Sequence, residues 1–310
     1  MIQAERLTKR YGPLLAVDAL SFEVAPGEVL GFLGPNGAGK STTMKMLTGF
    51  VAPTSGDAIV CGHRVSGDAR AARDRLGYLP EGAPSYPEMT VRAFLAFIAA
   101  MRGLRGPARR TAVDRAVGQL DLGDVLAQTV DTLSKGYRRR VGLAQAILHD
   151  PPVLILDEPT DGLDPNQKHQ VRRLIEGMAA DKIIIISTHI LEEVEAVCSR
   201  ALIISSGRIL ADDTPQGLAA RARRHNAVTL RPRAAGDAAQ IAEAVDALPG
   251  VDSVERADDG TVTAFPADGA PIIGDVAALA GERGWPLVEL HQESGRLDEV
   301  FREITGETVS

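Results

Sequence analysis

The sequence predicts a large α/β domain followed by a small α+β domain. Three features of the 310-residue chain support this prediction. A glycine-rich turn at 34–42 stands between a short apolar strand and the start of a helix. Two continuous apolar runs, at 153–156 and 183–186, are typical of parallel strands that are buried on both faces. After residue 226, strands and helices follow one another in an order that fits a separate small domain.

The turn at 34–42 matches the phosphate-binding pattern G-x-x-x-x-G-K-[ST]. Glycines let the backbone close around an anion, and the helix that follows adds the positive end of its dipole. We expect Lys40 to reach the β- and γ-phosphates of a nucleotide and the hydroxyl of Ser41 to hold Mg²⁺. A glycine-rich turn that binds nothing is the alternative, and the Lys-Ser pair argues against it. The residues predicted to bind nucleotide here are Gly34, Pro35, Asn36, Gly37, Ala38, Gly39, Lys40, Ser41 and Thr42.

Composition and charge exclude several classes of protein. With 34 Lys and Arg against 41 Asp and Glu, the formal net charge is −7, so we expect no nucleic-acid partner. The longest apolar stretches are too short to span a bilayer, and the N-terminus lacks the layout of a signal peptide. The two cysteines, Cys61 and Cys198, suggest neither a disulfide framework nor a metal cluster, which indicates a reducing cytoplasm.

The first part of the chain is predicted to consist mainly of strands. Tyr11, at the end of the first strand, lies upstream of the phosphate-binding turn and is placed to stack on an adenine ring. An ordinary half-exposed tyrosine is the alternative. Glu81 follows the strand that ends at Pro80. The elements expected here are strands at 2–11, 20–24, 28–33, 58–62 and 76–80 and a helix at 70–75.

From about residue 90 to 148 the pattern changes to helices alone. Thr90 opens the first helix, and Gly106-Pro107 separates it from the second. We therefore expect a helical subdomain inserted into the α/β domain. Three adjacent arginines, 138–140, follow Ser134-Lys135-Gly136-Tyr137; because the run is short, we interpret it as a solvated or anion-facing helix start rather than a nucleic-acid site.

Two carboxylates, Asp157 and Glu158, end the apolar run that starts at Val153. Ligand sites of open α/β sheets lie at the carboxyl ends of the strands. Asp157 is therefore a candidate ligand for Mg²⁺, which prefers carboxylate oxygen, and Glu158 is a candidate for polarising an attacking water. His189 stands at the end of the next buried strand. Each residue alone has an ordinary structural explanation, but together with the phosphate-binding turn they predict a catalytic site.

By order of motifs, residues 2 to about 215 resemble the nucleotide-binding ATPase subunit of ABC transporters. Gly34 to Thr42 matches the Walker A loop, Val153 to Glu158 matches Walker B with its following glutamate, and Gly162 to Asp164 matches the D-loop. Leu133 to Tyr137 stands where the family has its LSGGQ signature, and His189 matches the switch histidine. The resemblance implies a P-loop NTPase fold of the ABC ATPase type, with ATP and Mg²⁺ as ligands.

The resemblance also assigns roles within the site. It implies that Glu158 and His189 are catalytic, that Tyr11 stacks on adenine, and that Ser134 and Gly136 bind the γ-phosphate of ATP held by a second copy. The active unit is then a head-to-tail dimer with two shared sites. The metal ligands implied are Ser41, Asp157 and Glu81.

Three residues depart from the family pattern. Lys135 and Tyr137 replace a glycine and the glutamine of the signature, and Glu81 replaces the glutamine that usually relays nucleotide state to the membrane subunit. The segments around Glu81 and Lys135 are similar to those of ABC-2-type exporters, including the gliding-motility-associated ATPases. We expect activity to survive these changes.

The resemblance implies an integral membrane permease as a separate partner chain. A groove near Glu81, Tyr86, Met89 and Phe94 is the predicted contact. We therefore expect a cytoplasmic protein that is peripheral on the inner face of the cell membrane, and that powers an exporter. The alternative is a soluble ABC-type ATPase acting on a non-transport macromolecular partner; the single ATPase domain and the lack of a basic arm count against it.

The tail is predicted to form a second domain. We place the ATPase domain at 1–220 and an accessory α+β domain at 226–310, with a β-α-β-β-α-β order that is ferredoxin-like. A terminal helix begins at Leu297 and is similar to the ending common in exporter ATPases. The tail shows no catalytic constellation, so we expect its removal to leave the nucleotide site intact.

Overall fold

The computed structural model describes residues 1–83 and 85–306. They form two compact units, Met1–Thr214 and Pro215–Ser310. The division falls a few residues before the predicted end of the ATPase domain at 220. Residues 307–310 of the predicted accessory domain lie outside the described residues.

The larger unit is built on a six-stranded sheet. Its strand order is β10-β9-β3-β8-β7-β6, and all neighbours are parallel except β10 and β9. Every residue of β3, β7 and β8 is buried, which explains their continuous apolar sequences. The strands are β3 (Val29–Leu33), β6 (Leu76–Leu79), β7 (Val153–Asp157), β8 (Ile183–Thr188), β9 (Arg200–Ser205) and β10 (Arg208–Asp213).

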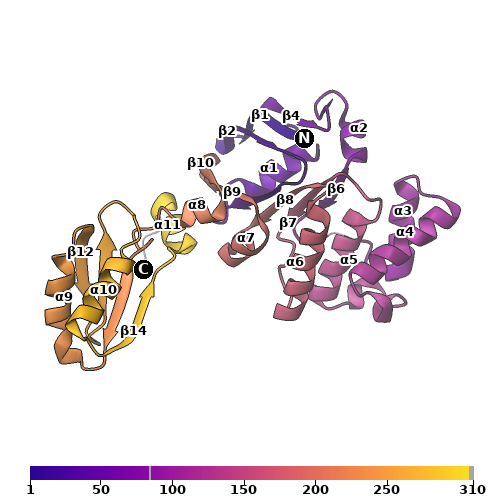
Figure 1. The fold of residues 1–310 in the computed structure, drawn as a ribbon. Coiled ribbons are helices and arrows are strands. Elements are labelled where there is room, and N and C mark those ends of the chain that lie inside the picture. The colour runs from indigo at the N-terminus through magenta and orange to yellow at the C-terminus, as the bar shows by residue number, and fades with distance from the viewer. Residues whose placement is uncertain (84, 307–310) are drawn as a thin grey trace. The chain divides into compact units, whose positions relative to one another are not determined.

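A second, antiparallel sheet completes the core of this unit. Helix α1 (Lys40–Leu47) lies between the two sheets (Figure 1), and its Met44, Met46 and Leu47 join one core with apolar residues of both. The position of α1 is fixed on two sides, so the turn before it is fixed as well. This sheet has the order β2-β1-β4-β5 and contains β1 (Ile2–Tyr11), β2 (Leu14–Val24), β4 (Ser55–Val60) and β5 (His63–Arg64).

Helices on the other side of the six-stranded sheet carry the remaining motifs. Helix α5 packs on β6, α6 on β8, and α7 on β3 and β8. Helices α3, α4 and α5 pack on one another and form the predicted helical subdomain (Figure 1). The hydroxyl of Thr90 caps α3 by accepting the N–H of Ala93 at 3.2 Å. The helices are α2 (Ala69–Asp74), α3 (Val91–Met101), α4 (Gly106–Gln119), α5 (Lys135–Ile147), α6 (Pro165–Ala179) and α7 (Leu191–Val197), with 3₁₀ turns at Gly123–Val125 and Val130–Thr132.

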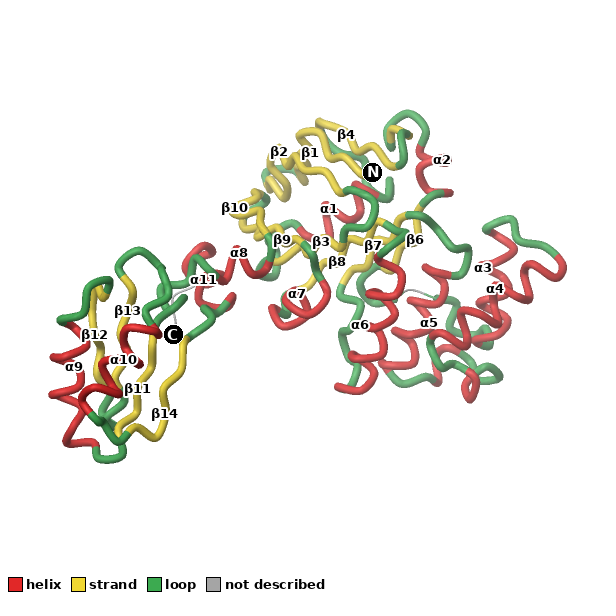
Figure 2. The backbone as a smooth tube through the Cα atoms, in the orientation of Figure 1, coloured by secondary structure: helices red, strands yellow, loops and turns green. Residues whose placement is uncertain are grey.

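The smaller unit contains the predicted β-α-β-β-α-β order. Its four strands form an antiparallel sheet in the order β12-β13-β11-β14 (Figure 2). Apolar residues of α9 and α10 pack with alternate residues of β11 and β13, so both helices cover one face of the sheet. The elements are α8 (Pro215–Ala219), β11 (Val228–Pro232), a 3₁₀ turn (Ala235–Asp237), α9 (Ala238–Asp246), β12 (Val251–Arg256), β13 (Val262–Pro266), α10 (Ile273–Arg283), β14 (Leu287–Gln292) and α11 (Leu297–Thr305).

Among the described helices, none combines the length and the apolar character that crossing a membrane requires.

Candidate functional site

The phosphate-binding turn requires glycine at two positions for steric reasons. A Cβ on Gly34 would lie 2.3 Å from the carbonyl oxygen of Ile204, and one on Gly39 would lie 2.5 Å from that of Ala16. Gly39 also has a φ of 103° directly before α1, in the left-handed region that disfavours side chains. The turn is therefore pressed against β9 and the end of β2, and its backbone shape is set by the fold around it.

Lys40 is buried at the first position of α1. Its Nζ donates to the carbonyl oxygens of Gly34 at 2.6 Å and Pro35 at 3.1 Å. Burial lowers the pKa of Lys40, and the charges of Glu158, Asp157 and Glu81 oppose that effect. The ammonium thus lies across the mouth of the turn, close to the carboxylates of the predicted site.

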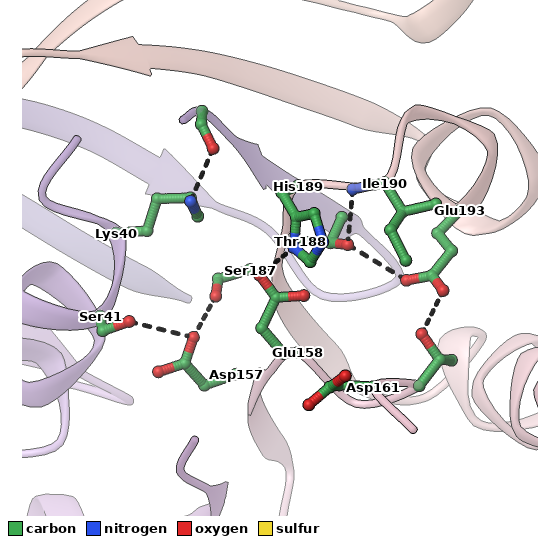
Figure 3. Close-up of polar contacts among 12 residues, drawn as sticks. Lys40, Ser41, Asp157, Glu158, Asp161, Ser187, Thr188, His189, Ile190 and Glu193 are labelled. Carbon is green, nitrogen blue, oxygen red and sulfur yellow. Dashed lines mark hydrogen bonds and ion pairs between the residues drawn. The ribbon is translucent and has the colours of Figure 1, made fainter. Parts of the chain in front are cut away.

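Asp157 lies at the end of β7 and is completely buried. Its Oδ1 accepts the hydroxyl of Ser187, from β8, and that of Ser41, from α1, the latter at 3.4 Å (Figure 3). Its Oδ2 has no hydrogen-bond partner within the part of the chain that the structure describes. A buried carboxylate oxygen without a partner is costly unless a cation occupies the position beside it. The structure thus brings together two of the three predicted metal ligands, Ser41 and Asp157.

Glu158 and His189 face each other across the ends of β7 and β8. The Nδ1 of His189 lies 2.9 Å from Oε1 of Glu158 (Figure 3), with the histidine more than half exposed and the glutamate largely covered. Burial raises the pKa of Glu158 above its ordinary value, although the contact with His189 and the charge of Lys40 oppose the rise. The two predicted catalytic residues are therefore adjacent, and the carboxylate has the environment of a proton acceptor.

Glu193 was not among the predicted site residues, but it links the loops that follow β7 and β8. Its buried carboxylate accepts the hydroxyls of Thr160, from the loop after Glu158, and Thr188, at the end of β8 (Figure 3). Lys168 of α6 forms an ion pair with it at 3.7 Å. Glu193 is buried because α7 packs against the sheet. The local sequence around Glu193 does not indicate this packing, so the residue could not be predicted.

A cavity of about 400 Å³ collects most of the predicted nucleotide-binding residues. Tyr11, predicted to stack on adenine, and Glu81, a predicted metal ligand, line it, and Leu14 and Ala16 of β2, which were not predicted, complete the wall. Neither Ser134 nor Gly136 is among its lining residues. The other residues that line it are Asn36, Gly37, Ala38, Gly39, Lys40, Ser41, Thr42 and Glu158.

The signature segment lies at the start of α5, against the loop that follows β7. The hydroxyl of Ser134 caps the helix by accepting the N–H of Tyr137 at 3.3 Å. A Cβ on Gly136 would lie 2.7 Å from Oε1 of Gln167, at the end of a flexible side chain, so the signature glycine lies close to α6 within the chain itself. Lys135 forms an ion pair with Asp161 at 2.9 Å. The lysine that departs from the family pattern thus ties the signature segment to the loop after Glu158.

Arg138–Arg140 were interpreted as a solvated or anion-facing helix start, and the solvated alternative is wrong for two of the three. The side chains of Arg139 and Arg140 are 5% and 4% exposed, and only Arg138 is open to solvent. The missed signal was the helical spacing: Gly136, Arg139, Arg140 and Leu143 lie on one buried stripe of α5.

The prediction of Phe94 as a groove residue is also wrong. Its side chain is only 1% exposed and lies beneath Tyr86, with the ring centroids 6.3 Å apart. Phe97, one turn further along α3, is exposed instead and packs edge-to-face on Tyr86 at 5.4 Å. Phe94 is a core residue of the helical subdomain, in which α3 packs on α4 and α5.

Comparisons with known proteins identify the same fold and motifs. Residues 17–161 match the family model described as "ABC transporter". The chain is 43% identical over 218 residues to the Nod factor export ATP-binding protein I of Burkholderia pseudomallei (strain 1710b), covering 70% of this chain and 72% of that one. It is 37% identical over 222 residues to the probable multidrug ABC transporter ATP-binding protein YbhF of Escherichia coli (strain K12), covering 71% of this chain and 38% of that one.

Solved structures agree with this assignment. A structure titled as the ATP binding subunit of an ABC transporter superposes with a TM-score of 0.66 at 30% identity, covering 70% of this chain and 91% of that one. The covered share of the chain is close to the length of the larger unit. The family match at 17–161 includes the phosphate-binding turn and the end of β7. The chain belongs to the ATP-binding subunits of ABC transporters, which are ATPases whose hydrolysis of ATP is coupled to transport.

Proposed function

We propose that this chain is the ATPase of an ABC-2-type exporter, that it works as a head-to-tail dimer with Mg²⁺ and ATP, and that it drives a separate membrane permease. The observation that carries the proposal is the cavity beside α1. It gathers an adenine-stacking tyrosine, a phosphate-binding turn with its lysine, and the carboxylate of Glu158 in one space.

The donors beside this cavity fit a magnesium ion. Mg²⁺ prefers oxygen ligands and usually takes few of them from the protein, the rest coming from water and phosphate. Ser41 and the partnerless Oδ2 of Asp157 would hold it, and Glu81, on the rim of the same cavity, is the third candidate. The ion would neutralise the charge that develops on the transferred phosphoryl group.

Hydrolysis needs a positioned water and a group that takes its proton. Glu158 has the raised pKa of such a group, and its carboxylate contacts His189. His189 holds the carboxylate of Glu158 at one oxygen and is sufficiently exposed to meet the γ-phosphate. Lys40 exchanges its two carbonyl contacts for phosphate oxygens when the nucleotide binds.

A second copy supplies what this cavity lacks. Ser134 and Gly136 do not line it, although the helix they begin presents its N-terminus and an exposed serine to solvent. A head-to-tail dimer would place the signature segment of each copy over the phosphates held by the other. Each chain then contributes to both sites.

The permease contact is proposed for the exposed aromatic pair Tyr86 and Phe97, together with Met89, whose N–H donates to the carbonyl oxygen of Tyr86, and with Glu81 as the residue that lines the nucleotide cavity. Phe94 supports this pair from the core. The export direction is supported by relatives whose names describe Nod factor export and multidrug transport. The transported molecule is set by the permease.

Co-purification tests this function. The tagged chain, extracted from native membranes in mild detergent, should bring down an integral membrane protein, and the reconstituted pair should move substrate only with hydrolysable ATP and Mg²⁺. Tyr86→Asp and Phe97→Asp should reduce recovery of that partner, whereas Leu210→Asp, an exposed residue of β10, should not. A chain that hydrolyses ATP but recovers only ribosomal or DNA-bound proteins would favour the alternative.

A further inference from the structure

Helix α5 carries two adjacent buried arginines whose guanidinium groups serve different parts of the fold. The Arg139 side chain is directed toward the ends of β6 and β7. The Arg140 side chain donates to the carbonyl oxygens of Leu120 at 3.0 Å and Asp121 at 3.1 Å, at the end of α4. Both side chains are almost fully buried, so the two arginines differ in their hydrogen-bond partners and not in their burial.

Arg139 holds the backbone around the predicted catalytic glutamate. One terminal nitrogen, Nη2, donates to the carbonyl oxygens of Asp157 and Glu158, and the other, Nη1, donates to that of Pro80 at 3.2 Å. Pro80 directly precedes Glu81 on the rim of the cavity. A single planar guanidinium therefore joins the segments that carry Asp157, Glu158 and Glu81.

The backbone at Glu158 needs such support. Its φ is 52°, in the left-handed region where a residue with a side chain is strained. Such a conformation persists only when the surroundings hold it. Three contacts do so here: the N–H of Glu158 donates to the carbonyl oxygen of Ser187 at 2.9 Å, and its own carbonyl accepts the N–H of Asp161 at 3.1 Å and the guanidinium of Arg139.

Arg139 also lies one helical turn after Gly136 on the same stripe of α5. The rigid first turns of this helix therefore connect the signature segment, which the proposed dimer offers to the nucleotide of its partner, with Glu158 of the same chain. We propose that Arg139 is a positioning residue for Glu158: it holds the strained backbone of the glutamate and ties it to the helix that begins at the signature serine. This inference rests on the proposed function of Glu158 as the hydrolytic carboxylate.

The test compares Arg139→Lys with Arg140→Lys. Lysine keeps the charge but has one nitrogen, so it cannot reach Pro80 and the Asp157–Glu158 carbonyls together. Both changes disturb an equally buried cation, and both variants should lose thermal stability. Only Arg139→Lys should lower kcat, by about ten- to a hundredfold. This is the scale expected when a catalytic group is displaced by roughly 1 Å. The Kd of this variant for ATP should stay within about twofold of wild type.

Pairing each change with Glu158→Gln separates positioning from general damage. If Arg139 acts through Glu158, the double variant Arg139→Lys/Glu158→Gln should be no slower than Glu158→Gln alone. Arg140→Lys should combine with Glu158→Gln additively. Should Arg139→Lys not fold, Arg139→Gln takes its place, because a neutral side chain carries no charge to desolvate.

The two proposals fail in different ways. If wild type hydrolyses ATP, Glu158→Gln stalls, and Arg139→Lys keeps its kcat or slows no more than Arg140→Lys, the positioning role is refuted and the proposed function stands. If Glu158→Gln turns over like wild type, the catalytic assignment itself fails. A fall in kcat that adds to that of Glu158→Gln would also refute positioning, because it would show an effect independent of the glutamate.

Discussion

At the scale of single residues, the chemistry of this chain depends on carboxylates that are kept from water. Glu158 is covered and its pKa is raised by burial, while Asp157 beside it is fully buried and bonded to two hydroxyls. Neighbouring carboxylates thus have different surroundings, which suits one to hold a metal and the other to accept a proton.

Glu158→Gln should keep ATP binding and stall hydrolysis, because the amide retains the shape of the carboxylate but cannot take a proton. The raised pKa means that the ionised carboxylate is less stable in the folded protein than in water, so the neutral amide should not lower the melting temperature at neutral pH. Single-turnover hydrolysis, nucleotide affinity and thermal unfolding measure the three effects. Undiminished turnover would exclude Glu158 as the hydrolytic carboxylate.

At the scale of elements, one buried carboxylate stabilises the edge of the antiparallel sheet. Asp57 of β4 accepts the Ser66 hydroxyl at 2.6 Å, the N–H of Ala58 at 2.8 Å, and Arg64 at 3.3 Å. Burial by itself would raise the pKa of Asp57, but these hydrogen bonds outweigh it and the pKa is lowered. The ionised form therefore belongs to the folded state.

Asp57→Ala should cost about 1–3 kcal/mol of stability at neutral pH, since it leaves the buried N–H of Ala58 without its acceptor and removes the hydrogen bonds from Ser66 and Arg64. A lowered pKa stabilises the fold above the ordinary carboxyl range, and the benefit is lost as the pH falls through the folded pKa. Denaturant unfolding of wild type and variant should therefore converge in acid. Asp114→Ala, on the exposed face of α4, is the control and should show no such convergence. If the difference in free energy of unfolding between wild type and Asp57→Ala is the same at pH 7 and in acid, ionisation of Asp57 does not stabilise the fold and the prediction is wrong.

Local patterns predicted the elements well where burial is complete. The runs that became β7 and β8, the turn before α1, and the helix-only stretch after Thr90 each lie where their own residues indicate. Where a residue is buried by an element distant in the sequence, the local pattern did not predict its burial. Arg139 is held by carbonyl groups far along the chain, and Phe94 is covered by its neighbours in the helical subdomain.

The backbone conformation of Glu158 could not be predicted from the sequence either. Its positive φ is held by contacts with Ser187 and Arg139, not by the local preference of glutamate. In the smaller unit the order of elements was predictable from alternation and turns. The short helix α8 was not predicted.

At the scale of the whole molecule, sharing of sites between copies can be tested by mixing two inactive variants. Lys40→Ala removes the phosphate contact and Ser134→Ala the signature contact, so each homodimer has two damaged sites. A mixed dimer has one undamaged site if the sites are shared, so an equal mixture should recover about a quarter of wild-type sites, since half the dimers are mixed and each has one good site of two. Activity no higher than that of the separate variants would refute the shared site.

The two units also predict where the chain can be cut. A chain ending at Thr214 should bind ATP with wild-type affinity, because all residues lining the cavity lie in the larger unit. A chain ending at residue 225 should be less soluble than the chain ending at Thr214. It keeps α8, whose Leu218 is fully buried, but it loses α11, against which α8 packs. Nucleotide titration and solubility of the two truncations measure this. Loss of ATP binding in a folded 1–214 chain would contradict it.

The packing of Gly136 on Gln167 and of Lys135 on Asp161 has a consequence for how two copies meet. A loop that becomes ordered only when two copies meet loses conformational entropy on binding. Association is then slow, because few encounters find the loop in its binding-competent conformation. Here the signature segment is already ordered by its own chain, so docking approaches a rigid-body event. Its rate is then governed by diffusion and long-range charge, and two copies that each carry a formal charge of −7 should associate faster as added salt screens their repulsion.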